Sequence, residues 1–341
     1  MASKKPRAGT KLLLATTFAI ALIAGTAAWR NYIKADPQII IPPYPTAPKP
    51  NGFDVYVKAA KMIVPANPAV DEVNDGRPPT DPKIRAQQYS LANKEAWLKQ
   101  NAPAFNTFQT ALGMRCLAPS SRVDESFPSY ASLRELARCK SIERHACEMR
   151  GDWNGAVQSQ LDTVQMGNDM ARGGSLISGL VAIAIEAIGR NNPWQNVEHL
   201  NTAQARAMAK RLEAIYNRRI TYADVLKEDK WVTLSELKPL FSDSDSSWRN
   251  ASKMLNNPSF IDRVKVFCVS KRAIANSTIQ RLDARIANAQ LPYTAPQKPL
   301  PPGDPISEMM SPDVSKARRF CARRCRKCVV ADGIGVARLQ A

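Results

Sequence analysis

The chain has 341 residues, of which 44% are hydrophobic, so it is long enough to bury one large or two modest cores. Its net charge of +18 first suggests a nucleic-acid-binding protein. The charge is concentrated at the two ends, however, because residues 1–34 carry +6 and residues 316–341 carry +7, which leaves +5 for residues 35–315. The body of the chain is therefore only modestly basic, and we expect no nucleic-acid partner.

Residues Leu12–Trp29 contain no charged side chain, and the residues before them include several basic ones and no acidic one. As a helix, this stretch would measure about 27 Å, close to the roughly 30 Å of a hydrocarbon core. Because basic flanks stay in the cytoplasm, we predict a cytoplasmic segment over 1–11, a single transmembrane helix over 12–29 that binds the membrane, and an extracytoplasmic main domain. The alternative is a signal peptide cleaved near Gly25–Ala28, which would leave a secreted or periplasmic protein.

The next segment is rich in proline, with six prolines between Pro37 and Pro50. Proline excludes a helix interior and favours extended polyproline II structure, so residues 30–50 are predicted to form a spacer. A ligand for a proline-reading domain is the alternative, but such readers are mostly cytoplasmic.

Between residues 51 and 291 the apolar residues recur at helical spacing, and strand-like alternation is scarce. The pattern predicts an all-α fold, with one multi-helix antiparallel bundle over 51–291. The stretch Ser175–Gly189 is apolar nearly all round, so we expect it to be the buried central helix. The predicted helices cover residues 52–64, 84–100, 103–113, 130–149, 153–172, 175–189, 202–216, 221–240 and 260–291. The predicted N-caps are Asn51, Asn101, Ser129, Asp152 and either Asn201 or Thr202.

The two helices at 130–149 and 153–172, joined by a Gly-Asp turn, resemble one tetratricopeptide hairpin, although no second copy with its own spacing is found. More broadly, the apolar segment, the spacer and the stretches FDVYVKAAKMI (53–63) and RGDWNGAVQSQL (150–161) are similar to those of uncharacterised bacterial proteins with an N-terminal anchor and an extracytoplasmic helical domain. The resemblance implies the same layout and brings no activity with it.

After the helical domain the chain becomes proline-rich again, which predicts a linker over 292–315 and a separate basic segment over 316–341. In that segment, Cys321, Cys325 and Cys328 have the spacing with which radical S-adenosylmethionine enzymes hold an iron–sulfur cluster. The same positions lie on one face of a helix, and that enzyme family carries a long chain after the motif, whereas little follows it here. We therefore predict a basic amphipathic helix that packs on the domain or adsorbs to anionic lipid, with a cluster or zinc as the alternative.

Other candidate sites have weaker signals. The chain has two histidines, His145 and His199, too few for a multi-histidine metal site. Cys139, Glu143 and Cys147 share a helix face, which is more typical of buried structural cysteine than of a metal site. Ser235–Lys238 matches the S-x-x-K of penicillin-recognising enzymes, but the S-D-N and K-T-G motifs of those enzymes are missing. Asp243 and Asp245 could contact calcium, but they lack the spacing of an EF-hand. Cys116 is a candidate disulfide partner for Cys139 or Cys147.

These observations predict a membrane-anchored, extracytoplasmic helical protein of the bacterial envelope that binds or scaffolds an unknown protein partner. We expect no catalytic, cofactor-binding or metal-binding residues. The first alternative is an envelope enzyme that uses the Cys cluster or carboxylates such as Glu143, Glu148 or Glu186. The second is a cytoplasmic nucleic-acid-binding protein that uses Arg318–Lys327, which requires the opposite topology.

Overall fold

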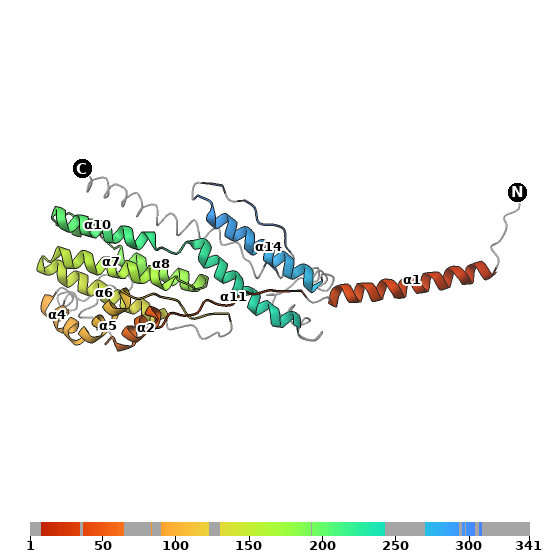
Figure 1. The fold of residues 1–341 in the computed structure, drawn as a ribbon, viewed down its shortest axis with the longest axis horizontal. Helices are drawn as coiled ribbons and strands as arrows, with labels where there is room; N and C mark the ends of the chain where they lie inside the picture. The colour runs from red at the N-terminus through yellow and green to blue at the C-terminus, as the bar shows by residue number, and fades with distance from the viewer. Residues whose placement is uncertain are drawn as a thin grey trace. The chain divides into compact units, whose positions relative to one another are not determined.

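The computed structural model describes residues 8–34, 37–64, 83, 90–122, 130–191, 193–242, 270–292, 295–296, 298–303 and 307–308. The regular elements among these residues are all helices, which confirms the predicted all-α class (Figure 1). The chain divides into two compact units. The larger unit is built on Pro42–Val232, and the smaller unit is built on Met1–Ile41, Thr233–Asn288 and Pro296–Asp313.

Three consecutive helices form the centre of the larger unit: α6 (Tyr130–Arg150), α7 (Trp153–Met170) and α8 (Leu176–Gly189). They lie side by side in Figure 1. The hydroxyls of Tyr130 and Ser178 lie 2.5 Å apart at the start of α6 and α8, and Arg144 donates to the carbonyl of Asn191 near their ends, so these two helices run parallel to each other. On one side, α2 (Gly52–Met62) and α4 (Leu91–Gln100) pack on α6, and α5 (Ala102–Leu112) packs on α2. Two further helices, α9 (Pro193–Val197) and α10 (Thr202–Asn217), pack on α7.

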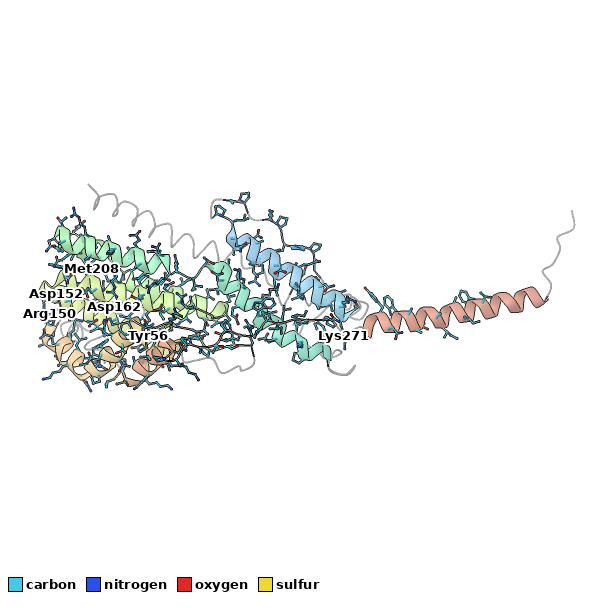
Figure 2. All side chains as sticks on the ribbon, in the orientation of Figure 1. Tyr56, Arg150, Asp152, Asp162, Met208 and Lys271 are labelled. Carbon is cyan, nitrogen blue, oxygen red and sulfur yellow. The ribbon has the colours of Figure 1, made fainter. Side chains whose placement is uncertain are left out.

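The turn between α6 and α7 forms as the sequence predicts. Gly151 has a φ of 76°, a conformation that glycine adopts at little cost at the end of a helix. Asp152 then caps α7 by accepting the backbone N–H of Gly155 at 2.9 Å. Figure 2 shows Arg150 and Asp152 together at this end of the larger unit.

The remaining N-cap predictions differ in outcome. Asn51 accepts the N–H of Phe53, as predicted. Of the two candidates Asn201 and Thr202, Asn201 is the cap, and it forms a capping box with Gln204. Ser129 lies outside the described residues. Asn101 was predicted to cap α5, but its side chain makes no such bond. The amide oxygen of its side chain instead accepts a hydrogen bond from the N–H of Val64 at 2.8 Å, so Asn101 joins the end of α2 to the α4–α5 junction.

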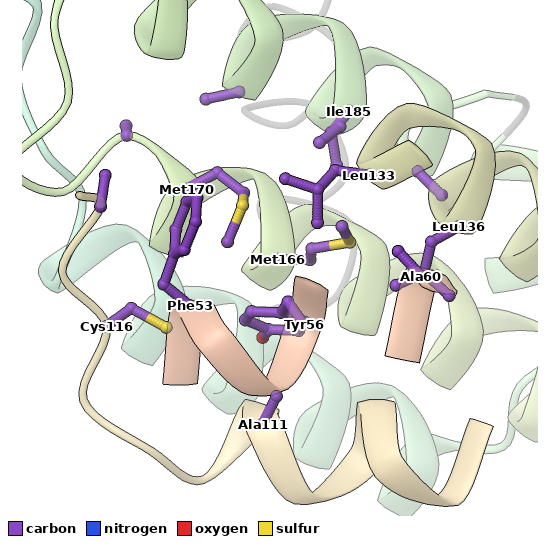
Figure 3. Packing of buried hydrophobic residues seen from close by; sticks show 14 of the residues in the cluster. Phe53, Tyr56, Ala60, Ala111, Cys116, Leu133, Leu136, Met166, Met170 and Ile185 are labelled. Atoms are coloured by element: carbon purple, nitrogen blue, oxygen red, sulfur yellow. The ribbon is translucent and has the colours of Figure 1, made fainter. Parts of the chain in front are cut away.

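The main core lies where α2, α6, α7 and α8 meet (Figure 3). Phe53 and Tyr56 of α2 contact Met166 and Met170 of α7 in this cluster, and Ile185 of α8 closes it. The exposed fraction of each of these side chains is 2% or less. At about 25 cal/mol per Å² of buried apolar surface, contacts of this kind provide most of the stabilisation of such a unit.

The central helix is α7 rather than the predicted Ser175–Gly189. Twelve of the 18 residues of α7 are buried, whereas six of the 14 residues of α8 are. The buried residues of α7 include polar ones such as Ser159, Asp162 and Asn168, which hydrogen-bond to neighbouring helices. These polar groups lower the apolar content of α7. A prediction from hydrophobicity alone therefore selects α8 as the central helix.

In the smaller unit, one hydrogen bond joins α14 (Lys271–Gln290) to the C-terminal end of α11 (Tyr222–Ser242), because the amine of Lys271 donates to the carbonyl of Phe241 at 2.8 Å. The segment Lys298–Gly303, here named the proline strap, lies along α14. The amide of Asn288 exchanges two hydrogen bonds with the backbone of Lys298, and Arg281 donates to the carbonyl of Pro301 at 2.6 Å. This part of the predicted 292–315 linker is therefore held on a helix.

The N-terminal helix α1 (Ala8–Lys34) contradicts the predicted location of the protein. Within the described residues, no helix combines the length and the apolar character needed to cross a bilayer. The prediction of a single-pass anchor over Leu12–Trp29 with an extracytoplasmic main domain is therefore wrong for this part of the chain.

Candidate binding surface

The three carboxylates considered for catalysis each meet a different cation in the larger unit. Glu143 pairs with Lys140, Glu148 lies 3.4 Å from Arg144, and Glu186 accepts Arg190 at 2.8 Å and Arg219 at 3.3 Å. Glu148 also accepts the amide of Asn196 at 2.7 Å. Carboxylates that share a catalytic site are expected to converge on the same space, whereas these three are held by separate partners.

Lys140 lies at the centre of a buried polar network that the sequence analysis did not identify. Its amine, on a side chain 1% exposed, lies between Glu143 and Asp162, with Asp162 at 3.3 Å. Asp162 also accepts the amide of Gln109 at 2.6 Å and the guanidinium of Arg211 at 2.5 Å (Figure 2 labels Asp162). Two cations and two carboxylates are thus balanced, which is the arrangement expected of a structural ion-pair network.

A second buried group joins Tyr56 to Asp169. The hydroxyl of Tyr56 donates to a carboxylate oxygen of Asp169 at 3.2 Å. Burial raises the pKa of Asp169 to about 6, although the bond from Tyr56 and the charges of Arg172 and Arg218 act in the opposite direction. Burial also raises the pKa of the Cys116 thiol, so this cysteine lacks the thiolate character of a nucleophile. The local sequence around these residues gives no signal of their contact.

The cysteine and histidine candidates have structural surroundings. Cys116, Cys139 and Cys147 are buried cysteines, and His199 stacks on Trp153 with ring centroids 3.9 Å apart. Among the described residues, no three side chains of the metal-binding types come together. Several candidates lie outside the described residues, namely Cys321, Cys325, Cys328, Asp243, Asp245 and the segment Arg318–Lys327.

The clearest surface feature of the larger unit is the outer side of α8. Ile177 and Leu180 remain 47% and 45% exposed, and Ala184 and Ala187 continue their row at half-buried positions. Residues 177, 180, 184 and 187 follow the spacing of one helix face, so they form a continuous apolar line, here named the α8 stripe. The opposite face of the same helix packs Ala182 and Ile185 into the core.

An exposed basic side chain lies on the neighbouring helix α6. Arg134 is exposed and makes no ion pair with the described residues. It lies one turn after Tyr130, on the same side of α6 as Tyr130 and Arg144. Tyr130 contacts Ser178 of α8, and Arg144 donates to the carbonyl of Asn191 just after α8. An apolar line with an exposed cation on the neighbouring helix is suited to an amphipathic partner of negative charge.

Comparison with protein-family models, with curated proteins and with solved structures found no match to this chain.

Proposed function

We propose that this is a non-catalytic helical binding protein, and that the α8 stripe docks an acidic amphipathic helix of a partner protein. The observation that carries the proposal is the exposure of Ile177 and Leu180 on a helix whose other face is fully packed. Exposed apolar rows of this kind mark interaction sites when they are contiguous.

The spacing of the α8 stripe fits a helical ligand. Side chains at i, i+3, i+7 and i+10 form a ridge, and the grooves beside such a ridge accept the side chains of a second helix. The small residues Ala184 and Ala187 at one end would let the two backbones approach, whereas Ile177 and Leu180 at the other end would act as anchors.

The charge of the chain decides between an acidic partner and a second copy. With +5 on residues 35–315 and strongly basic ends, two copies of this chain repel each other, while an acidic helix is attracted over a distance set by the ionic strength. Arg134, exposed on the neighbouring helix α6, is a further basic group for such a partner. We therefore favour an acidic partner over self-association.

An enzyme has less support. Glu143 and Glu186 are neutralised by neighbouring cations, and the carboxylate with a raised pKa, Asp169, is buried against Tyr56. A general acid or base must reach its substrate within hydrogen-bond distance, which the packing of these groups disfavours.

The test uses a synthetic 18-residue amphipathic peptide with leucines along one face and glutamates along its borders. Its affinity for the full chain is measured by fluorescence anisotropy, beside a peptide in which lysines replace the glutamates. We expect the acidic peptide to bind at least tenfold more tightly, and we expect the double variant Ile177→Gln, Leu180→Gln to lose at least tenfold in affinity.

The matched control is Met149→Gln, which changes another exposed apolar side chain of the larger unit, on α6. It is expected to bind the acidic peptide as the parent does. Equal binding of the two peptides would reject the acidic partner. Unchanged binding by the double variant would reject the α8 stripe as the docking surface.

A further inference from the structure

The inner face of α14 in the smaller unit buries positive charge. Lys271, Arg281 and Arg285 are each 7% exposed, and they lie on the same side of the helix as Thr278 and Asn288. Charged side chains are rarely buried unless they are paired, so each of these cations calls for a partner.

Two of the three cations have partners among the described residues. The amine of Lys271 donates to the carbonyl of Phe241 at 2.8 Å. Arg281 donates to the carbonyl of Pro301 at 2.6 Å and lies 3.9 Å from a carboxylate oxygen of Glu308. Carbonyl oxygens therefore accept hydrogen bonds from both groups, and Glu308 places a negative charge beside Arg281.

Arg285 differs from both. Its Nε and Nη2 atoms are buried and have no hydrogen-bond partner, and the hydroxyl of Thr278 on the same face is also buried without one. Leaving a buried donor unpaired destabilises the folded state, and more so when the group is charged. The face of α14 therefore holds two unsatisfied polar groups, one of them a cation.

The two unpaired nitrogens of Arg285 identify the kind of ligand. Nε and Nη2 lie on one edge of the guanidinium, and their N–H bonds point the same way as a fork that matches two oxygens of one carboxylate or phosphate. Arg281 and Thr278 lie about one and two turns before Arg285 on the same face of α14, so an anion held by this fork lies on the face that carries them.

We propose that the inner face of α14 is an oxyanion-binding site, in which Arg285 holds two oxygens of a phosphate or carboxylate group and Thr278 donates a further hydrogen bond. The proline strap contributes to the selectivity of this site. Pro299, Pro301 and Pro302 have no backbone N–H, so recognition of the anion rests on the side chains of α14. The site is separate from the α8 stripe and takes a different ligand, so the two proposals fail or succeed independently.

The experiment measures binding of inorganic phosphate and of acetate to the full chain by calorimetry, with sodium chloride adjusted to keep the ionic strength constant. Melting temperature is followed in parallel, because a ligand that binds the folded state raises it. Phosphate and acetate distinguish the two possible sources of the oxyanion. We expect at least one of them to bind in preference to chloride and to raise the melting temperature of the parent.

Three variants test the assignment. Arg285→Met removes the fork, and Arg285→Lys keeps the charge but lacks the paired N–H groups, so both are expected to bind the anion at least tenfold more weakly. Thr278→Val, which keeps the shape of the side chain, is expected to bind severalfold more weakly. Arg272→Met, which removes an exposed cation of the same helix, is expected to bind as the parent does.

Circular dichroism first establishes that each variant is folded, and Arg285→Lys serves if Arg285→Met does not fold. Absence of any response of the parent beyond that to chloride would overturn the proposal. Equal anion affinity in the parent and in Arg285→Lys would overturn the bidentate assignment. An equal loss in Arg272→Met would show that general surface charge, and not this site, attracts the anion.

Discussion

The hydroxyl of Tyr56 donates to a carboxylate oxygen of Asp169 at 3.2 Å, and this bond joins α2 to the central helix α7. Asp169 is mostly buried, and its pKa of about 6 lies above the value of about 4 that an aspartate has in an unfolded chain. The folded state therefore keeps a proton that the unfolded state releases. When Asp169 is ionised, burial of its charge therefore lowers the free energy of unfolding, although the carboxylate accepts the hydrogen bond of Tyr56.

The first prediction concerns the pH dependence of stability. Because the folded-state pKa of Asp169 is raised, the free energy of unfolding falls as pH rises from about 4 to about 6, and Asp169 destabilises the protein at pH 7. Asp169→Asn removes this ionisation and still accepts the hydrogen bond of Tyr56. We expect the variant to be about 2–3 kcal/mol more stable than the parent at pH 7, with little difference at pH 4.

Urea unfolding at several pH values measures this difference. Asp224→Asn is the control of opposite sign, because hydrogen bonds from Thr221 lower the pKa of Asp224 and its charge is therefore stabilising above pH 4. A destabilised Asp169→Asn at pH 7 would show that the charge of Asp169 is better compensated than its burial suggests.

The second prediction concerns Lys140. Replacing it with Met leaves Glu143 and Asp162 without their shared cation, so we expect a loss of about 3–5 kcal/mol in the free energy of unfolding. The double variant Lys140→Met, Asp162→Leu is expected to lose less than the sum of the two single variants, since either single change already breaks the contact between the two side chains. Denaturant unfolding of the two single variants and the double variant gives the coupling. Additive effects would mean that the two side chains do not act as a pair.

The third prediction separates the two faces of α8. Ile185 is fully buried, whereas Ile177 is 47% exposed on the same helix. Ile185→Asp places an unpaired charge in the core and is expected to abolish cooperative folding. Ile177→Asp is expected to change stability by less than about 1 kcal/mol. Thermal melting followed by circular dichroism checks both, and similar effects of the two changes would contradict the assignment of faces.

Local signals account for the parts of the fold that the sequence predicted. Asp152 and Asn201 cap helices through residues three positions away, so a short stretch contains the whole interaction. Tyr56 and Asp169 lie 113 positions apart, and no periodicity indicates such a contact. The same limit hid the contact of Lys140 with Asp162 and the unpaired edge of Arg285.

The apolar pattern also failed in an informative way at α8. A helix that is apolar all round is expected to be buried, yet Ile177 and Leu180 are exposed. Hydrophobicity measures the tendency of a residue to leave water, and it does not specify whether the covering surface belongs to the same chain. Conversely, α7 is the more deeply buried helix although it carries Asp162 and Asn168, because neighbouring helices satisfy these groups.

The last prediction concerns the close approach of α7 and α8. A Cβ atom added to Gly167 would lie 2.8 Å from the carbonyl oxygen of Ala182 and 2.9 Å from the backbone N of Glu186, and both are backbone atoms that cannot move aside without shifting α8. A Cβ atom added to Gly189 of α8 would likewise lie 2.9 Å from the backbone N of Val164 in α7. Each helix thus offers a glycine where it meets the other.

Gly167→Ala should therefore destabilise the larger unit by about 1–3 kcal/mol, although alanine favours a helix over glycine by roughly 1 kcal/mol. Gly113→Ala is the control, because the nearest atom to its added Cβ is an ordinary 3.9 Å away. Chemical denaturation of both variants measures the difference. If Gly167→Ala proved as stable as the parent or more so, the helix propensity of alanine would outweigh the steric contact, and the two backbones would have to lie farther apart than this structure places them.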